Sequence, residues 1–268
     1  KKLKSYISVI LNLSTDHLER HETLKKYFSI KLKIFDNAKY KIINNNLEYS
    51  KKDFTFDVKN NSIYVNNSSI KNLTFKNYNF ISYKDKKYKI NGRHEAYNLS
   101  ACIAVLSILG LSLDEIIHGF SKRSHLSHRL ERFCTYDGVT YINDSKSTNS
   151  DSTFNALESV EDNIILIMGG DNKKISYNAL NNIINNKVKL LILIGENREY
   201  VNNQLSVNID TILLETLKDA TDYIFSNLKS NCTVLLSPGS SSFSLYKDFE
   251  HRGNHFKTLV SNYVHGKT

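Results

Sequence analysis

Apolar and polar positions follow two different patterns along the chain, and the change between them falls near residue 125. In the first part, residues 6–11 form a short apolar run typical of a buried strand. Apolar residues then recur between residues 24 and 35 at the spacing of one helix face, and residues 40–43 read as a short strand. Polar and aromatic positions alternate between residues 54 and 88, which predicts small antiparallel strands around Asn-rich turns.

Two helices are predicted to close the first part. Residues 98–109 are rich in small apolar side chains, and Gly110 follows in the position that commonly ends a helix. Ser112 and Glu115 have the spacing of a capping box that opens a further helix, to about His118. The pattern then becomes polar and irregular, so we place two domains at residues 1–125 and 126–268.

The second part contains four apolar runs, each followed by a polar or glycine-bearing loop and then a helical stretch. Alternating strands and helices predict an α/β fold with a doubly wound, mostly parallel sheet. Ligands bind such sheets outside the carboxyl ends of the strands, so the four loops predict a site before any motif is considered. The runs are residues 139–142, 164–168, 190–194 and 234–236.

Composition narrows the range of partners. The 268 residues carry 36 Lys and Arg against 27 Asp and Glu, a formal charge of +9. The lysines are dispersed and form no dense arm, so we read the charge as compositional bias that also attracts anionic small substrates, not as a nucleic-acid surface. No apolar run approaches the ~20 residues of a membrane span. Three distant cysteines without CxxC spacing predict reduced thiols in the cytoplasm.

Polar side chains gather in the predicted strand-end loops. Asp144 and Lys146 follow the first strand of the second part, where they can hold a ribose and a phosphate or cap the next helix. Lys173 is a cation placed by a glycine turn at residues 169–170. Residues 237–242 form a hydroxyl-rich turn, predicted to lie at a helix N-terminus, where free N–H groups favour a carboxylate or a phosphate. A plain helix cap is the alternative there.

Three further residues each allow two interpretations. Arg129 can reach a polyphosphate or form a surface salt bridge. Lys31 falls on the apolar stripe of its own helix, where a lysine either extends its amine to solvent or is held inward for a chemical task. His17 follows a strand as core filler or as a metal ligand.

Together these blocks resemble, in order and spacing, the Mur ligases of peptidoglycan synthesis. The Asp-Ser-Lys-Ser-Thr-Asn and Ser-Pro-Gly-Ser-Ser-Ser-Phe sequences are similar to the members of the family that add D-glutamate. The matching blocks are residues 10–20, 27–31, 128–131, 143–149, 169–173 and 236–253.

The resemblance implies an ATP-dependent amide ligase that adds D-glutamate to UDP-N-acetylmuramoyl-L-alanine through an acyl phosphate, with ATP and Mg²⁺ as cofactors and a monomeric state. It implies that residues 1–125 are part of a central Mur-ligase ATPase domain and that residues 126–268 are a Rossmann-like domain that binds ATP and D-glutamate. A folylpolyglutamate synthetase-like ligase shares this architecture. A non-catalytic binding remnant is the alternative from another class.

Residue roles also follow from the resemblance alone. It implies that His17 and Lys31, the latter as a carbamate, bind magnesium, and that Lys146 lies near the transferring phosphoryl group. These three form the implied catalytic set. The implied ATP-binding residues are Asn98, Arg129, Asp144 and Lys146. The implied D-glutamate-binding residues are Thr148, Lys173, Ser242 and Phe249.

Two features depart from the family pattern. Glu95 stands where the family has an adenine-binding asparagine, so only Asn98 carries that role. In addition, the 268 residues contain no Gly-x-x-Gly-Lys-Thr phosphate loop. We therefore expect the chain to be the carboxyl-terminal portion of a longer ligase and to have no ligase activity by itself.

Overall fold

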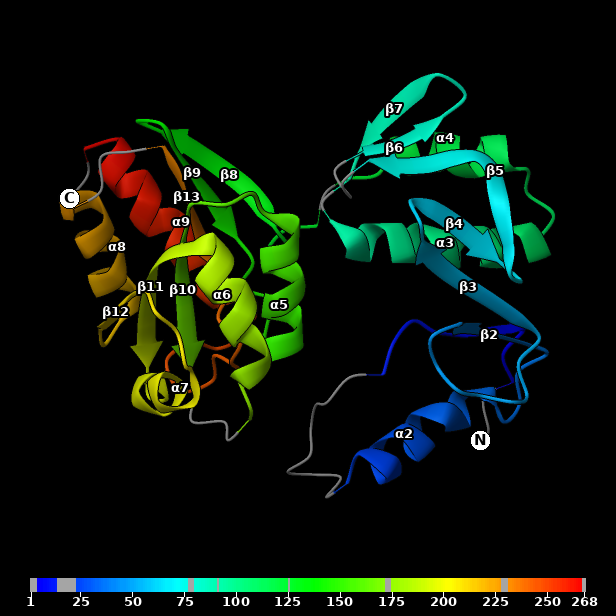
Figure 1. The fold of residues 1–268 in the computed structure, drawn as a ribbon, viewed down its shortest axis with the longest axis horizontal. Coiled ribbons are helices and arrows are strands. Elements are labelled where there is room, and N and C mark those ends of the chain that lie inside the picture. The colour runs from blue at the N-terminus through cyan, green and yellow to red at the C-terminus, as the bar shows by residue number, and fades with distance from the viewer. Residues whose placement is uncertain are drawn as a thin grey trace. The chain divides into compact units, whose positions relative to one another are not determined.

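The computed structural model describes residues 4–13, 23–76, 80–90, 92–124, 126–171, 175–227 and 231–266. The chain divides into two compact units, Lys1–Ser124 and His125–Thr268 (Figure 1). Each unit has its own sheet and its own hydrophobic core.

Within the described ranges, the first unit holds a seven-stranded sheet whose strand order follows the chain. Its first three strands pair in parallel and the remaining pairs are antiparallel, as the alternating pattern of residues 54–88 predicted. The strands are β1 (Ile7–Ile10), β2 (Tyr40–Asn44), β3 (Phe54–Lys59), β4 (Ser62–Val65), β5 (Ser68–Lys76), β6 (Phe80–Tyr83) and β7 (Lys86–Lys89).

The helices of the first unit are α2 (Leu24–Leu32), α3 (Arg93–Ile108) and α4 (Leu113–Ser121), and a 3₁₀ turn, Lys33–Phe35, continues α2. The predicted start of α3 at residue 98 was wrong. Ala96, in its first turns, is fully buried and belongs to the helix, although the sequence around it is polar. Likewise, α4 continues to Ser121, three residues beyond the predicted end at His118.

Both predicted helix-end signals are confirmed. Gly110 has φ +87°, and its N–H donates to the Ser107 carbonyl at 3.1 Å while the N–H of the following residue reaches back to Leu106. These two hydrogen bonds form the Schellman motif, in which glycine is the usual residue at this left-handed position. Ser112 and Glu115 form the predicted capping box, each side chain accepting a hydrogen bond from the other's backbone N–H.

The described part of the second unit forms a six-stranded sheet in the order β12-β11-β10-β13-β9-β8. All neighbours pair in parallel except β8 and β9, so the predicted doubly wound sheet is confirmed. The four predicted strands are β9, β10, β11 and β13. The edge strands β8 and β12 were missed, since edge strands need not carry a continuous apolar run. The strands are β8 (Glu131–Tyr136), β9 (Val139–Asn143), β10 (Ile164–Gly170), β11 (Val188–Gly195), β12 (Asp210–Leu213) and β13 (Cys232–Leu236).

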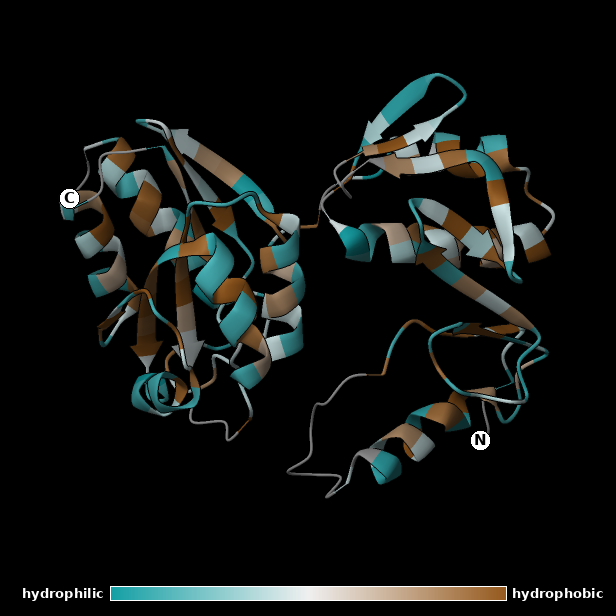
Figure 2. Ribbon diagram, viewed as in Figure 1, coloured by the Kyte–Doolittle hydropathy of each residue, from teal (hydrophilic) through white to brown (hydrophobic). Residues whose placement is uncertain are grey.

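Helices cover both faces of this sheet (Figure 1). Along β10, Leu166 and Met168 face one cluster, whereas Ile165 and Ile167 face the other, as the period of a strand requires. Helices α5, α6 and α7 pack on the first face, and α8 and α9 on the second; the central strands carry the most apolar residues (Figure 2). The helices are α5 (Ser150–Ser159), α6 (Asn181–Lys187), α7 (Arg198–Gln204), α8 (Leu217–Asn227) and α9 (Phe249–Val264), with a 3₁₀ turn at Asn178–Leu180.

The carboxyl ends of β9, β10, β11 and β13 lie along one edge of the sheet, which we call the carboxyl edge. Gly170 at the end of β10 pairs with Gly195 at the end of β11, and Leu236 at the end of β13 pairs with Asn143 at the end of β9. The loops after these strands are therefore neighbours, as the sequence predicted. The fold thus positions one candidate site on the second unit.

Among the described residues, no helix is both long enough and apolar enough to cross a bilayer. The three cysteines, Cys102, Cys134 and Cys232, are free thiols, as their spacing predicted.

Two helical glycines provide a matched test of packing near the carboxyl edge. A Cβ at Gly253 in α9 would collide with His128 Nδ1 and lie 2.9 Å from Asn143 side-chain atoms, whereas a Cβ at Gly119 in α4 meets nothing within 4 Å. We expect Gly253→Ala to lower the free energy of unfolding of the second unit by about 1–3 kcal/mol, because the crowded site must shift. Gly119→Ala should stabilise the first unit by about 0.5–1 kcal/mol.

Urea unfolding followed by NMR signals of each unit measures both changes. Equal stabilisation by the two substitutions would show that α9 does not pack against His128 as described.

Candidate functional site at the carboxyl edge

Asp144, directly after β9, connects two of the strand-end loops. Its side chain is 5% exposed. One oxygen accepts the Leu130 N–H at 3.2 Å, and the other accepts the hydroxyls of Ser147 and Ser237, the latter at 2.8 Å. Burial raises the pKa of Asp144 to about 6 and outweighs these bonds, which favour the ionised form. Asp144 therefore joins the loop after β9 to the loop after β13, and the next helix is capped by Asn149 instead.

Arg252 of α9 is buried beneath the same two loops, with 1% of its surface exposed. Its Nε donates to the Ser145 hydroxyl at 3.0 Å and one terminal nitrogen to the Ser145 carbonyl at 2.9 Å. The other terminal nitrogen donates to the carbonyls of Ser240 and Ser241, at 3.0 and 3.2 Å. Arg252 forms no ion pair with a described residue, and burial lowers its pKa to about 10. Carbonyl and hydroxyl oxygens therefore accept the hydrogen bonds of this charge, and Asp171 and Asp144 act on it only at longer range.

Sequence reasoning missed Arg252, although a signal was present. The residue stands three positions after Phe249 and four before Phe256, on the face that α9 buries. A charged residue at such a position either extends outward or has buried partners.

A second buried group supports the loop after β13, which we call the serine loop (residues 237–248). Asn197 donates to the Ser240 hydroxyl at 2.7 Å and accepts the Gly170 N–H at 2.9 Å. The hydroxyls of Tyr177 and Ser240 lie 2.6 Å apart, and burial raises the pKa of Tyr177 to about 12. No motif had singled out Tyr177 or Asn197.

The serine loop precedes α9 rather than forming its N-terminus, so that expectation was wrong. The helix begins at Phe249, and its N-cap is Asp248, whose carboxylate accepts the His251 N–H at 2.8 Å. The strongly polar sequence of the loop had suggested an earlier start. Two N–H groups of the loop, those of Phe243 and Ser244, donate to the Asp171 carboxylate.

The segment between β8 and the boundary of the unit presents Arg129 to solvent. On one side of it His128, in a left-handed conformation with φ +62°, is buried with its Nδ1 2.9 Å from Asn143. Burial and the charge of Lys257 lower the pKa of His128. On the other side Glu131 accepts the His128 N–H at 2.9 Å and pairs with Lys257 at 3.0 Å. The flanking contacts fix the turn and leave the Arg129 guanidinium exposed.

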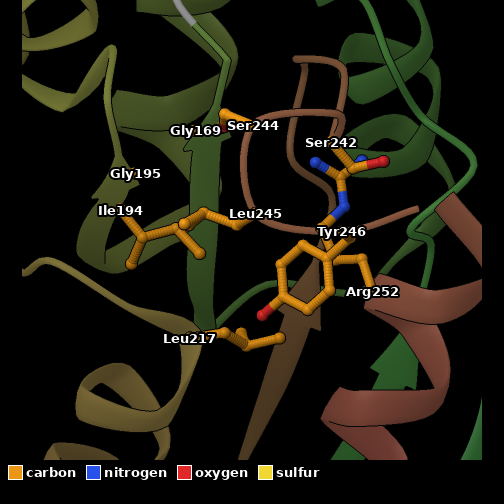
Figure 3. Close-up of a pocket in the computed structure, with 10 residues that line it drawn as sticks. Gly169, Ile194, Gly195, Leu217, Ser242, Ser244, Leu245, Tyr246 and Arg252 are labelled. Atoms are coloured by element: carbon orange, nitrogen blue, oxygen red, sulfur yellow. The ribbon is translucent and has the colours of Figure 1, made fainter. Parts of the chain in front are cut away.

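The predicted ligand residues Lys146, Thr148 and Ser242 lie in the loops that Asp144 and Arg252 connect, and Phe249 is the first residue of α9. The Lys146 ammonium lies 3.7 Å from the centre of the Phe249 ring, and both side chains are half-buried, as is Thr148. Ser242 is buried and lines a small depression beneath the serine loop, beside the Arg252 guanidinium (Figure 3).

The predicted site residues of the first unit that the structure describes, Lys31 and Asn98, are both exposed. Lys31 is exposed on α2, with its ammonium 4.7 Å from the centre of the Tyr27 ring, so of the two interpretations the structure agrees with the one in which the amine extends to solvent. The ring face supplies an attractive surface for the cation. Asn98 is exposed on α3. His17 and Lys173 lie outside the described residues.

Glu95, which departs from the family pattern, is bound within the first unit. Its carboxylate pairs with Arg123 at 2.7 Å, and both side chains are largely buried. Arg123 in turn stacks on the Phe120 ring, 3.8 Å from its centre. Glu95 thus connects the start of α3 to the end of α4.

The described residues do not by themselves form a magnesium site. Across these ranges, no group of three His, Cys, Asp or Glu side chains gathers as metal ligands. The implied ligands are His17, which is not described, and Lys31, which is exposed.

Comparison with known proteins matches both units. Residues 1–106 match the family model of the Mur ligase middle domain, and residues 128–239 match that of the Mur ligase, glutamate ligase domain. A protein of Aquifex aeolicus named UDP-N-acetylmuramoylalanine–D-glutamate ligase is 32% identical over 97% of the chain. A Thermoanaerobacter protein of the same name is 33% identical over 97%. The chain spans 64% and 61% of these two relatives.

Solved structures share the fold. The chain is similar to UDP-N-acetylmuramate-alanine ligase of Thermotoga maritima, with a TM-score of 0.68 at 18% identity over 97% of this chain and 60% of that one. It is also similar to MurF of Acinetobacter baumannii, with a TM-score of 0.70 at 13% identity over 98% and 60%. At these identities the likeness shows the fold alone.

The raised pKa of Asp144 predicts a pH dependence of stability. Because the folded value, about 6, lies above the ordinary 3.8, the folded state binds the proton more tightly. The stabilisation is complete below pH 3.8 and is lost as the pH rises through 6, about 3 kcal/mol in all. Measured against Asp144→Asn, which does not ionise, the stability of the wild-type chain should therefore fall between these values.

Urea unfolding of both proteins across this range measures the difference, and a ¹³C titration of the carboxyl group gives its pKa directly. A midpoint near or below 4 would contradict the assignment.

Proposed function

The chain belongs to the Mur ligase family, and we propose that it carries the nucleotide- and D-glutamate-binding part of a ligase that adds D-glutamate to UDP-N-acetylmuramoyl-L-alanine. The sequence at residues 143–149 and the names of the curated relatives support this choice within the family. Because the chain spans about 60% of those relatives, the activity of the whole enzyme is part of the proposal.

The observation that carries the proposal is the grouping of Lys146, Ser242 and Phe249 at the carboxyl edge. Lys146 and Ser242, assigned to ligands by resemblance, lie in two loops that Arg252 binds from beneath, and Phe249, the first residue of α9, lies against Lys146. Open α/β sheets bind their ligands at this edge. Rigid support beneath these side chains favours ligand binding, because the loops lose less conformational entropy when the ligand binds.

In the proposed reaction, the muramoyl-alanine carboxylate attacks the γ-phosphate of ATP, giving an acyl phosphate and ADP. The D-glutamate amine then attacks the acyl carbon, a tetrahedral intermediate forms, and phosphate leaves as the amide is made. Lys146 supplies a cation for the transferring phosphoryl group, and the exposed Arg129 a planar fork for the polyphosphate. Asn98 and Asp144 complete the proposed ATP contacts.

The proposed D-glutamate pocket uses Thr148 and Ser242 as hydroxyl donors, Lys173 as a cation and Phe249 as an aromatic wall. ATP and Mg²⁺ are the proposed cofactors, with His17 and carbamylated Lys31 as metal ligands; Mg²⁺ bound there would neutralise negative charge on the transferring phosphoryl group. The enzyme is proposed to act as a monomer in the cytoplasm on small molecules only.

Two lysine substitutions, one on each side of the site, should each weaken the binding of a different ligand. We expect the chain to bind D-glutamate, and Lys173→Ala to weaken that binding ~10–150-fold, because a hydrogen bond between charged groups contributes ~1.5–3 kcal/mol. Nucleotide affinity should change much less. Lys146→Ala should weaken nucleotide binding instead. Lys189→Ala, which removes an exposed cation at the opposite end of β11, is the matched control.

NMR titration with D-glutamate and calorimetry with ATP give both affinities. The proposal fails if the wild-type chain does not bind D-glutamate. The placement of the two ligands fails if Lys173→Ala abolishes nucleotide binding and leaves D-glutamate binding unchanged.

A further inference from the structure

Buried side chains hold the first half of the serine loop. The carbonyls of Ser240 and Ser241 accept hydrogen bonds from Arg252, and the Ser240 hydroxyl accepts one from Asn197. Both donors are fully buried. The loop is therefore fixed up to the residue that precedes Ser242.

Packing contributes little to the residues that directly follow Ser242, whereas Tyr246 packs against the core near the end of the loop. Phe243 is 75% exposed and Leu245 is 53% exposed, so neither side chain secures the backbone by burial. The small depression beneath the loop, lined in part by Ser242, Ser244 and Leu245, leaves space under it (Figure 3). Hydrogen bonds must therefore hold the backbone at Phe243 and Ser244.

Asp171 supplies these hydrogen bonds. Its two carboxylate oxygens accept the N–H groups of Phe243 at 2.8 Å and Ser244 at 2.7 Å. Its own N–H donates to the Ser241 carbonyl at 3.1 Å, so Asp171 grips the loop on both sides of Ser242. Burial alone would raise the pKa of Asp171, but hydrogen bonds from Ser244 and its neighbours hold it below the usual value. The carboxylate is thus charged at neutral pH.

The glycine pair before Asp171 permits this approach. A Cβ at Gly170 would collide with the Ser241 carbonyl oxygen, and Gly170 has φ +155°, a conformation that other residues rarely adopt. Gly169 donates its N–H to the Pro238 carbonyl at 2.8 Å. The end of β10 therefore lies directly against the serine loop, which places Asp171 beside the second half of the loop.

We propose that Asp171 is the positioning residue of the D-glutamate pocket, holding the serine loop in the shape that lets Ser242 bind a ligand carboxylate. The inference rests on the proposed function, in which Ser242 contacts D-glutamate. Asp171 has two opposite effects on binding. Its positioning of the loop strengthens the binding of an anionic ligand, whereas its negative charge weakens that binding by repulsion. Removing Asp171 therefore lowers the affinity if positioning dominates and raises it if repulsion dominates.

The test compares Asp171→Ala, Asp171→Asn and Asp171→Glu with the wild-type chain, using D-glutamate and ATP as probes. We expect Asp171→Ala to weaken D-glutamate binding at least tenfold and to change ATP affinity less than threefold. Asp171→Asn keeps the shape but replaces one acceptor with a donor, so it should also lose affinity, whereas Asp171→Glu restores part of it. Asp210→Asn, an exposed carboxylate at the amino end of β12, is the charge-matched control.

Hydrogen exchange of the Phe243 and Ser244 amides provides an independent readout, since protection should fall at these two positions in Asp171→Ala. A general structural defect would instead lower the melting temperature and weaken both ligands alike, which overturns the inference. Unchanged or tighter D-glutamate binding by Asp171→Ala and Asp171→Asn also overturns it. A wild-type chain that binds no D-glutamate contradicts the proposed function itself, so the two failures are distinguishable.

Discussion

The buried guanidinium of Arg252 is the constraint on which the carboxyl edge depends. An isolated charge in a protein interior is strongly unfavourable unless hydrogen bonds replace its hydration. Here Ser145, Ser240 and Ser241 supply that replacement from two loops at once. If either loop moved away from α9, the Arg252 guanidinium would lose hydrogen-bond acceptors. This loss of hydrogen bonds is unfavourable and therefore fixes the positions of the two loops relative to α9.

Two carboxylates complete this arrangement in different environments. Asp144 lies in the interior, where burial raises its pKa and its oxygens join the loops after β9 and β13. Asp171 lies nearer the surface, where loop hydrogen bonds keep its pKa low. Asp144 thus holds the start of the serine loop and Asp171 holds its second half, and Ser242 lies between these two points. The shape of the site thus depends on Asp144, which is also a proposed ATP contact, and on Arg252 and Asp171, which are not among the proposed ligand contacts.

Local sequence signals predicted most of the fold, and long-range contacts account for what they missed. The Schellman glycine Gly110 and the Ser112 capping box depend on neighbours within five residues, so the sequence reveals them directly. In contrast, Arg252 bonds to a residue 107 positions away, and Asp171 to residues 72 and 73 positions away. Such pairings appear only once the sheet order is known. The resemblance supplied the proposed ligand-binding residues, Asp144 among them, but assigned no role to Arg252 or Asp171, which hold the serine loop.

The central claim is that the carboxyl edge of the second unit, supported by Arg252, binds D-glutamate. A crystal structure of the chain grown with D-glutamate and ADP tests it most directly. The account predicts the amino acid at the carboxyl edge, with one carboxylate at the Ser242 hydroxyl and the serine loop unchanged over Arg252. Density for D-glutamate away from this edge, or a serine loop detached from Arg252 in the complex, would contradict it.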